Sequence, residues 1–487
     1  GTCLVGSEMC IRDRPDADLT LRGKGDLNQI DLQSLSIQTL GGEVSGTVMA
    51  NWQAPINWAA NLSLKDIQPG LQWQQAEGNI SGKLATTGSL TEQGGWQVEL
   101  PTLDIDGILR DYPLNIEGAL SASDKAGTGE LKIDTPRLVL SHGPNHLTAK
   151  GDVEQNLNMQ LAVDFPDIAK SVPDLRGSAQ GQIKLTGKLD KPLVGVDLNV
   201  KAIKWQQDVQ VEDVSLQGQI SPLPLPSGEL QLKVANAKYQ DYLIDKVLLN
   251  FDGEQQQHAL TLDLESNIAS TKLAIKGALQ DKPELMWKGA LERMSLTSEQ
   301  GTWNLNQPTQ LEFLIDSQQA FVAAHCWLQA DASICLDQDV NAGQSGEAHL
   351  SIKQFDFDQV KAFVPQAIKL EGGVNATAMA KWAPEQAPQV MMKLEMPKGS
   401  VTQNSEQPVH LGWESLKLNA SLAENTLHAD WLLDVADNGD ISGELNIPDV
   451  LAKDKQIDGR LGLTTFNLDF LAPILGDYSK LKSNIAT

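Results

Sequence analysis

The sequence has few aromatic residues, few cysteines and little positive charge. Phe, Trp and Tyr make up 5% of its 487 residues, and only 4 residues are cysteine. Lys and Arg number 38 against 63 Asp and Glu, which gives a net charge of -25 at pH 7. A nucleic-acid partner needs clustered basic side chains, so this balance excludes that class. No apolar run approaches the ~18–20 residues of a membrane-spanning helix, and no signal peptide is recognisable.

The usual frames for catalysis are also missing. The sequence contains no His-Glu-x-x-His metal frame, no Gly-x-Ser-x-Gly elbow and no phosphate-binding P-loop. Pairs of carboxylates occur at Asp104/Asp106 and Asp356/Asp358, without the further loop ligands that a calcium site needs. We therefore predict a protein that is not an enzyme and that binds no metal and no cofactor. The histidines are dispersed along the chain, at positions 142, 146, 258, 325, 349, 410 and 428.

What the sequence does contain is apolar residues at every second position. Leu157, Met159 and Leu161 alternate with Asn158 and Gln160, and the same pattern recurs along most of the chain. Successive side chains of a strand point to opposite faces, so this pattern predicts strands with one apolar and one polar face. It is typical of antiparallel sheets that are solvated on one side.

A short helical pattern that ends at proline interrupts the strands three times. It covers residues 165–173, 357–365 and 468–473, and in the first two copies a glycine and a strand pattern follow. The strand half recurs without the helix at residues 42–52, whose sequence is similar to that of residues 373–382. The spacing between copies is uneven, which excludes a solenoid of fixed period. We predict three short helices at the rim or mouth of a sheet, and less than about a quarter helix overall.

An apolar sheet face can be shielded from water in two ways. A second sheet can cover it, or the sheet can curl so that the face lines its own groove. Periodicity alone favours the first solution, a set of closed sandwich cores. The tryptophans are open to two interpretations as well, a stacking surface for a ligand or structural packing. Recurrence at matched places in the repeats, Trp52 and Trp382, favours packing.

From about Leu19 to its end, the chain resembles the TamB family of AsmA-like periplasmic proteins. Several marks in a specific order carry the resemblance. They are the repeated Leu/Phe-x-x-hydrophobic-x-Pro followed by Leu-x-Gly or hydrophobic-x-Gly, HALTL at 258–262 leading to IKG at 275–277, WKGAL at 287–291, WNL at 303–305, CW at 326–327, CL at 335–336 and GEA at 346–348.

The resemblance implies an all-β fold, an elongated and twisted antiparallel sheet curled into an open, taco-like hydrophobic groove. It also implies a role in outer-membrane biogenesis, with phospholipids carried between the two membranes and outer-membrane proteins assembled together with the barrel TamA. The implied place is the periplasm of a Gram-negative bacterium. The inner-membrane anchor, any targeting element and the domain that engages TamA would lie outside this chain.

With an open groove, the alternating residues would line a path for lipid acyl chains. Two other functions stay open: an exported adhesin or autotransporter passenger, and a purely structural tether. A polysaccharide-acting enzyme would need paired carboxylates with clustered aromatics, which we do not find. The expected lining residues are Leu157, Met159, Leu161, Val196, Leu198, Val200, Leu230, Leu232, Val234, Leu260, Leu262 and Leu264.

In an oxidising periplasm, Cys326 and Cys335 are expected to form a disulfide across a hairpin, with Cα atoms about 4.4–6.8 Å apart. A zinc site with His325 and His349 is the alternative, and two free thiols are the simplest interpretation.

Residues 1–14 do not share the alternation of the rest and are interpreted as adaptor-derived sequence. Residues 15–487 are expected to form one continuous groove region.

Overall fold

The computed structural model describes residues 16–465, apart from 207, 224–225, 282, 366 and 404–408. Strands make up 74% and helices 3% of the structure, and all pairings are antiparallel. The predicted all-β fold class is therefore confirmed. The chain divides into two units, residues 1–253 and 254–487, which are described separately. The prediction that residues 15–487 form one continuous region stays a prediction.

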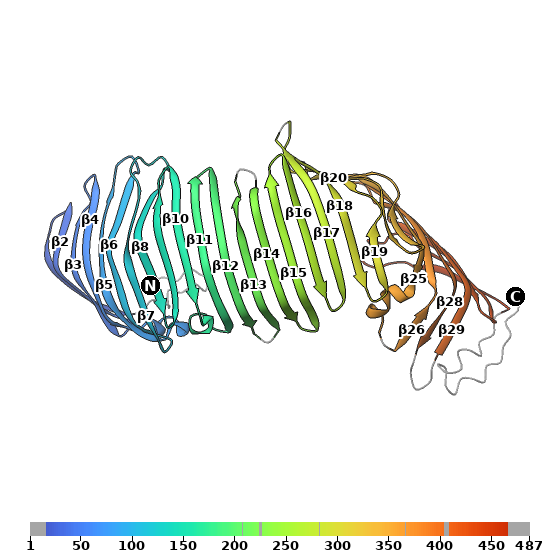
Figure 1. Ribbon diagram of the computed structural model, residues 1–487, viewed down its shortest axis with the longest axis horizontal. Coiled ribbons are helices and arrows are strands. Elements are labelled where there is room, and N and C mark those ends of the chain that lie inside the picture. Colours follow the sequence, from blue (N-terminus) through green and yellow to red (C-terminus); the bar gives the residue numbers. More distant parts are fainter. Residues whose placement is uncertain are drawn as a thin grey trace. The chain divides into compact units, whose positions relative to one another are not determined.

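Unit 1 is a meander in which each strand pairs with the next along the chain (Figure 1). Within the described residues β1 pairs only with β2, so the sheet is open at this edge. Its strands are β1 (Ala17–Gly25), β2 (Gln29–Thr39), β3 (Gly42–Asn51), β4 (Ile56–Ile67), β5 (Gly78–Leu90), β6 (Trp96–Leu109), β7 (Tyr112–Asp124), β8 (Lys132–His142), β9 (Asn145–Val153), β10 (Asn156–Phe165), β11 (Leu175–Lys188), β12 (Lys191–Trp205), β13 (Val209–Ser221), β14 (Ser227–Tyr239) and β15 (Tyr242–Glu254), with the 3-10 helices η1 (Pro69–Leu71), η2 (Gln74–Ala76) and η3 (Ile168–Lys170).

Unit 2 is also an antiparallel sheet. Its elements are β16 (Gln257–Ser266), β17 (Ala269–Gln280), β18 (Met286–Ser298), β19 (Gly301–Leu305), β20 (Thr309–Leu314), β21 (Gln319–Val322), β22 (His325–Gln329), β23 (Ala332–Leu336), β24 (Val340–Ala342), β25 (Gly346–Asp356), the 3-10 helix η4 (Phe357–Phe363), β26 (Ile368–Glu371), β27 (Gly373–Trp382), β28 (Gln389–Gln403), β29 (Val409–Ala423), β30 (Thr426–Val435), β31 (Gly439–Ile447) and β32 (Asp458–Thr464).

The strands of unit 1 are bent rather than straight (Figure 1). Register shifts recur along the meander, for instance at Gly177 opposite Ala202 and between Leu100 and Leu103. A β-bulge bends its strand and increases the local twist. A series of bulges on neighbouring strands therefore curls the sheet while the apolar residues on both sides of each bulge stay on one face.

At three successive positions in the sheet of unit 2, two short strands take the place of one long strand: β19 and β20, β22 and β21, and β23 and β24. We call the gap between these halves the break. β18 pairs with β20 through one half and with β19 through the other, and the pairs β21–β24 and β22–β23 continue this division. Side chains take over the missing backbone bonds at the break. Asn306 Oδ1 accepts from the Cys326 amide at 2.9 Å, and Asp339 Oδ1 accepts from the Ala324 amide at 2.8 Å. The break is thus capped rather than frayed.

Tryptophans cover glycines on neighbouring strands. Trp431 lies opposite Gly443, so close that even a methyl group on the glycine would overlap the indole ring. Trp58 over Gly88 and Trp382 over Gly346 repeat this arrangement. A large ring packed on a bare backbone protects a strand position that has no side chain of its own. The packing interpretation agrees with these contacts for Trp382, whereas Trp52 is 47% exposed and covers none of the described glycines.

The predicted short helices are shorter and tighter than expected. Residues 165–173 contain only η3, and residues 357–365 contain η4; both are 3-10 helices. The third copy, at 468–473, lies outside the described residues. Sequence reasoning missed η1 and η2, although Asp66-Ile67 before Pro69 repeats the Asp167-Ile168 that starts η3. Ile67 and Ile168 are equally buried, each 6% exposed.

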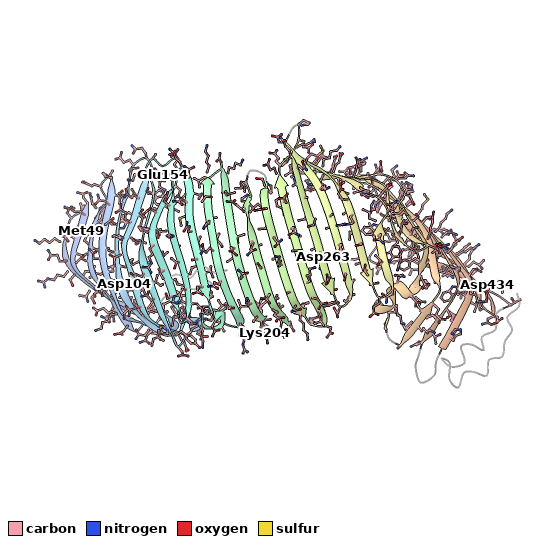
Figure 2. All side chains as sticks on the ribbon, viewed as in Figure 1. Met49, Asp104, Glu154, Lys204, Asp263 and Asp434 are labelled. Carbon is pink, nitrogen blue, oxygen red and sulfur yellow. A yellow bond between two sulfur atoms is a disulfide. The ribbon has the colours of Figure 1, made fainter. Side chains whose placement is uncertain are left out.

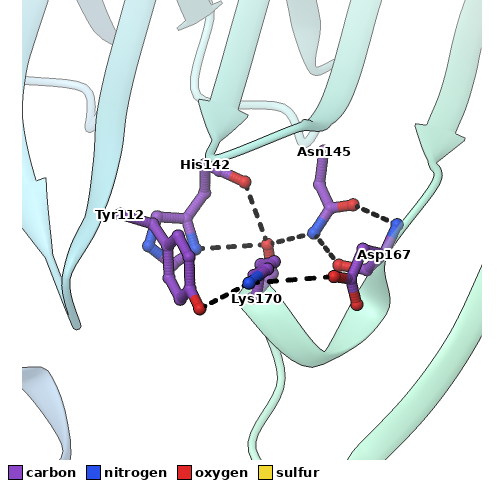
Figure 3. Close-up of polar contacts among 6 residues, drawn as sticks. Tyr112, His142, Asn145, Asp167 and Lys170 are labelled. Atoms are coloured by element: carbon purple, nitrogen blue, oxygen red, sulfur yellow. Dashed lines mark hydrogen bonds and ion pairs between the residues drawn. The ribbon is translucent and has the colours of Figure 1, made fainter.

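A buried asparagine fastens η3 to the end of the sheet (Figure 3). Asn145, only 1% exposed, donates from Nδ2 to the Asp167 carbonyl and to Ser171 Oγ, both at 2.7 Å. Its Oδ1 accepts from the Asp167 amide at 3.2 Å. His142 closes the cluster, with Nδ1 3.1 Å from Ser171 Oγ and Nε2 2.8 Å from the Leu109 carbonyl. The helix is thereby tied to the turns between neighbouring strands.

We predict that Asn145→Ala loosens η3. The substitution strands buried polar groups of Asp167 and Ser171, at a cost of about 1–3 kcal/mol. Hydrogen exchange at the amides of residues 168–172 should become faster. Asn158→Ala is the matched control, since Asn158 lies exposed on β10 and makes one bond to Asp152. Equal exchange in the two variants would show that Asn145 does not hold the helix.

Candidate functional site

The register of unit 1 brings the predicted lining residues together on one face of β10–β15. Each row takes one residue from each of the six strands. One row contains Leu161, Ile183, Val196, Gly218, Leu230 and Phe251; the next contains Val163, Gly181, Leu198, Leu216, Leu232 and Leu249; the third contains Phe165, Ala179, Val200, Val214, Val234 and Val247; and a fourth, on the other side of the first, contains Met159, Leu185, Val194, Ile220, Gly228 and Gly253. Leu157 lies beyond the fourth row, opposite Gly187. We call this surface the apolar face.

The opposite face of the same strands is polar. Gln217 donates from Nε2 to Asp197 Oδ1 at 3.1 Å, and Gln231 donates in the same way to Asn250 Oδ1 at 2.7 Å. These residues alternate along the strands with those of the apolar face. Strands β10–β15 therefore form the two-faced sheet that the sequence predicts, with mainly polar side chains opposite the apolar face.

No described residue of unit 1 covers the apolar face. Every lining residue predicted on β10, β12 and β14 is half-buried, whereas the core of a sandwich buries such residues almost completely. Among the described residues only eleven apolar side chains are buried, and none of them lies on β10–β15. The closed-core alternative, which periodicity alone favoured, does not describe these strands.

The footprint of the apolar face is as large as that of apolar patches that commonly serve binding. Strand spacing and residue rise place its four rows over about 24 by 20 Å, or about 500 Å². Exposed apolar patches of a few hundred Å² are the largest that typical monomers carry, and they commonly serve binding. The face has no charged group in its rows, so it offers apolar contact and no chemistry.

In unit 2 the predicted residues Leu260, Leu262 and Leu264 lie on β16. They are half-buried and stand opposite Ile275, Leu273 and Thr271 of β17. The lining role assigned to all these residues stays a prediction.

Another part of unit 2 packs against itself. Trp303 of β19 and Phe355 of β25 are separated by two strands, β22 and β23, which corresponds to about 14 Å in a flat sheet. Their ring centroids are nevertheless 5.9 Å apart and nearly parallel, and Trp303 is 9% exposed. The sheet is curled tightly enough here to make a small closed core. Sequence patterning could not reveal this contact, because it joins residues 52 positions apart.

The structure joins Cys326 and Cys335 by a disulfide across the β22–β23 hairpin. Their Cα atoms are 4.0 Å apart, closer than the expected range. The reason is their place in the ladder: the backbone groups of Cys326 bond toward Asn306, so the two cysteines form a non-hydrogen-bonded pair, in which Cα atoms approach most closely. The bond takes both thiols away from the zinc alternative.

Other candidate chemistry gains little from the geometry. No group of three or more His, Cys, Asp or Glu in the described part of the chain is arranged to hold a metal ion. Among those same residues, no helix is both long and apolar enough to span a membrane. A depression of about 650 Å³ lies on the polar face over Gly195, lined by Gln182, Lys184 and Asp197 among others and by no aromatic side chain.

Comparisons with known proteins agree on one family. The sequence model of the TamB N-terminal domain matches residues 5–487. The chain is 26% identical over 466 residues to the Translocation and assembly module subunit TamB of Haemophilus influenzae, which covers 95% of this chain and 35% of that protein. It is 19% identical over 288 residues to the Uncharacterized protein BU087 of Buchnera aphidicola, covering 59% of this chain and 27% of that protein. No solved structure matches the chain.

We predict that the disulfide stabilises the hairpin region of unit 2. Closing so short a loop contributes about 2–3 kcal/mol, by constraining the unfolded chain. The double variant Cys326→Ser/Cys335→Ser should therefore unfold at lower urea concentration than the parent. A reductant should lower the parent's midpoint to that of the variant and leave the variant unchanged. Coinciding midpoints without reductant would mean that the bond contributes nothing.

Proposed function

The chain belongs to the TamB family, and on that premise we propose that it forms part of a non-enzymatic periplasmic bridge for outer-membrane biogenesis. In this proposal the apolar face carries phospholipid acyl chains between the inner and the outer membrane. The bridge also supports assembly of outer-membrane proteins together with TamA. The chain spans about 35% of the length of its Haemophilus influenzae relative, and an inner-membrane anchor and a contact with TamA belong to the proposal for the whole protein.

The observation that carries the proposal is the open apolar face of β10–β15. Acyl chains gain about 0.8 kcal/mol for each methylene that leaves water, and a chain laid across the rows loses contact with water on one side. The rows contain aliphatic residues and glycine with a single Phe at each end, and no charge. Such a lining holds a chain without a deep trap, so that a lipid can slide along it. The polar opposite face keeps the protein in water.

The closed core around Trp303 and Phe355 favours a second role for part of unit 2. A segment packed against itself and joined by a disulfide offers acyl chains less room than the open rows of unit 1. A purely structural tether is the candidate function that this observation supports. In that account the chain ties the membranes together for assembly of outer-membrane proteins and carries no lipid.

We predict that a charge on the apolar face blocks lipid. Leu232 stands in the same row as Val163 and Leu198. The substitution Leu232→Asp would put a carboxylate beneath the bound chain. Burying an unpaired ion costs several kcal/mol, so lipid occupancy should fall about tenfold or more. The readout is photo-crosslinking of lipid to a reactive residue at Leu198 in the full-length protein, alongside rescue of a deletion strain.

The matched control is Lys233→Asp, which places the same side chain on the polar face one residue away. This variant should crosslink lipid and rescue growth like the parent. If Leu232→Asp folds, rescues and crosslinks as well as Lys233→Asp, the lipid path is wrong and the tether becomes the better account.

A further inference from the structure

One rim of the apolar face ends in a row of exposed aromatic residues. The register aligns Trp205 of β12, Tyr239 of β14 and Tyr242 of β15 in the last row, with Val209 of β13 between them. Trp205 is 54% exposed, and both tyrosines are 52% exposed. The row lies at the turns from β12 to β13 and from β14 to β15, where the apolar rows meet water.

Three of the four tyrosines of the chain lie at turns that follow even-numbered strands. The sequence has four, of which Tyr239 and Tyr242 lie in this row and Tyr478 lies outside the described residues. The remaining one, Tyr112, lies where β6 turns into β7, next to η3, whose Lys170 contacts it. We call Tyr112, Trp205, Tyr239 and Tyr242 the tyrosine rim.

The opposite rim of β11–β15 has a different composition. Its end rows contain Gly187 opposite Pro192, and Gly228 opposite Gly253. The exposed large side chains in its turns are Leu189 and Leu223, 49% and 52% exposed. Neither Tyr nor Trp occurs in the described residues of those turns. The two rims of one apolar face are therefore chemically unlike.

Ammonium groups accompany the aromatic rings. Lys170 Nζ donates to the Tyr112 hydroxyl at 2.6 Å and lies 4.3 Å from the centre of its ring (Figure 3). That hydrogen bond raises the pKa of Lys170 above its ordinary value. Lys204 and Lys238 are the strand neighbours of Trp205 and Tyr239, so alternation turns them to the polar face at the same rim, where both pair with Gln210. Lys204 lies at the rim in Figure 2.

The same turns also carry Asp208 and Asp241, so net charge alone does not distinguish this rim. The aromatic side chains do. Trp and Tyr have an apolar body and a polar tip, and they favour the level between hydrocarbon and water where lipid headgroups lie. Lysines at that level donate charge-assisted hydrogen bonds to phosphate. An aromatic row that ends an apolar face therefore has the chemistry of a membrane interface.

We propose that the tyrosine rim binds the glycerol and phosphate part of a phospholipid whose acyl chains lie on the apolar face. The inference rests on the proposed function and adds to it an orientation. Headgroups leave the face at the turns that follow even-numbered strands. The opposite rim, which ends in Gly187, Gly228 and Gly253, stays free of headgroups. A lipid then keeps one orientation while it slides across successive strands.

The test uses full-length protein loaded with two photoreactive phospholipids, one with a diazirine on the headgroup and one with it at the acyl terminus. Crosslinked residues are mapped by mass spectrometry. The headgroup probe should label the segments around Trp205 and Tyr239–Tyr242 and spare Leu189 and Leu223. The acyl probe should label the rows that contain Leu198 and Leu232.

The variant Trp205→Ala/Tyr239→Ala/Tyr242→Ala should lower headgroup labelling about tenfold, which corresponds to about 1.4 kcal/mol, and leave acyl labelling in place. Leu189→Ala/Leu223→Ala is the matched control and should change neither. Should the triple variant fail to fold, the labelling map of the parent protein decides alone. Equal headgroup labelling of both rims, with the acyl probe still on the face, overturns the orientation and leaves the lipid path standing. Loss of acyl labelling from the face overturns both.

Discussion

The alignment of apolar residues across neighbouring strands is the constraint on which the rest of this structure depends. In β10–β15 every strand contributes a residue to the same rows, and a slip of one residue in any pairing would turn that strand's apolar side chains to the polar face. Where strands bulge, as at Gly177 opposite Ala202, the pairing shifts and Leu175 and Trp205 still meet beyond it. The sheet can therefore bend without losing its apolar face.

An exposed apolar face leaves stability to other contacts. Tryptophans packed over glycines, the buried Asn145 beneath η3 and the disulfide between β22 and β23 each fasten part of the sheet from its ends or within its strands. None of them occupies the rows of β10–β15, so the fold is held without filling the surface that the proposal assigns to lipid. The tyrosine rim fits the same division, because it ends the face without covering it.

Much of this could be predicted from local pattern. Alternation along residues 157–163 and 194–200 was sufficient to place those residues on one face. The spacing of Cys326 and Cys335 allowed a hairpin disulfide and left a zinc site and free thiols open, and the structure joins the two cysteines. The helices at 165–173 and 357–365 proved to be 3-10 turns, and a proline follows each of them, which disfavours a helical conformation in the residue before it. Contacts between distant residues, such as Trp303 on Phe355 or Asn145 on Asp167, depend on how far the sheet curls, and no local pattern encodes that. Burial could not be predicted either, since period two is the same in a closed core and on an open face.

In the working protein, acyl chains are proposed to occupy the apolar face of β10–β15. A cryo-electron microscopy map of the full-length protein in lipid tests this proposal most directly. The account predicts elongated density, too narrow for a polypeptide, along the rows that contain Leu161, Leu198 and Leu232. Density for another protein segment seated on those rows, or a bare face at a resolution that shows the surrounding side chains, would contradict it.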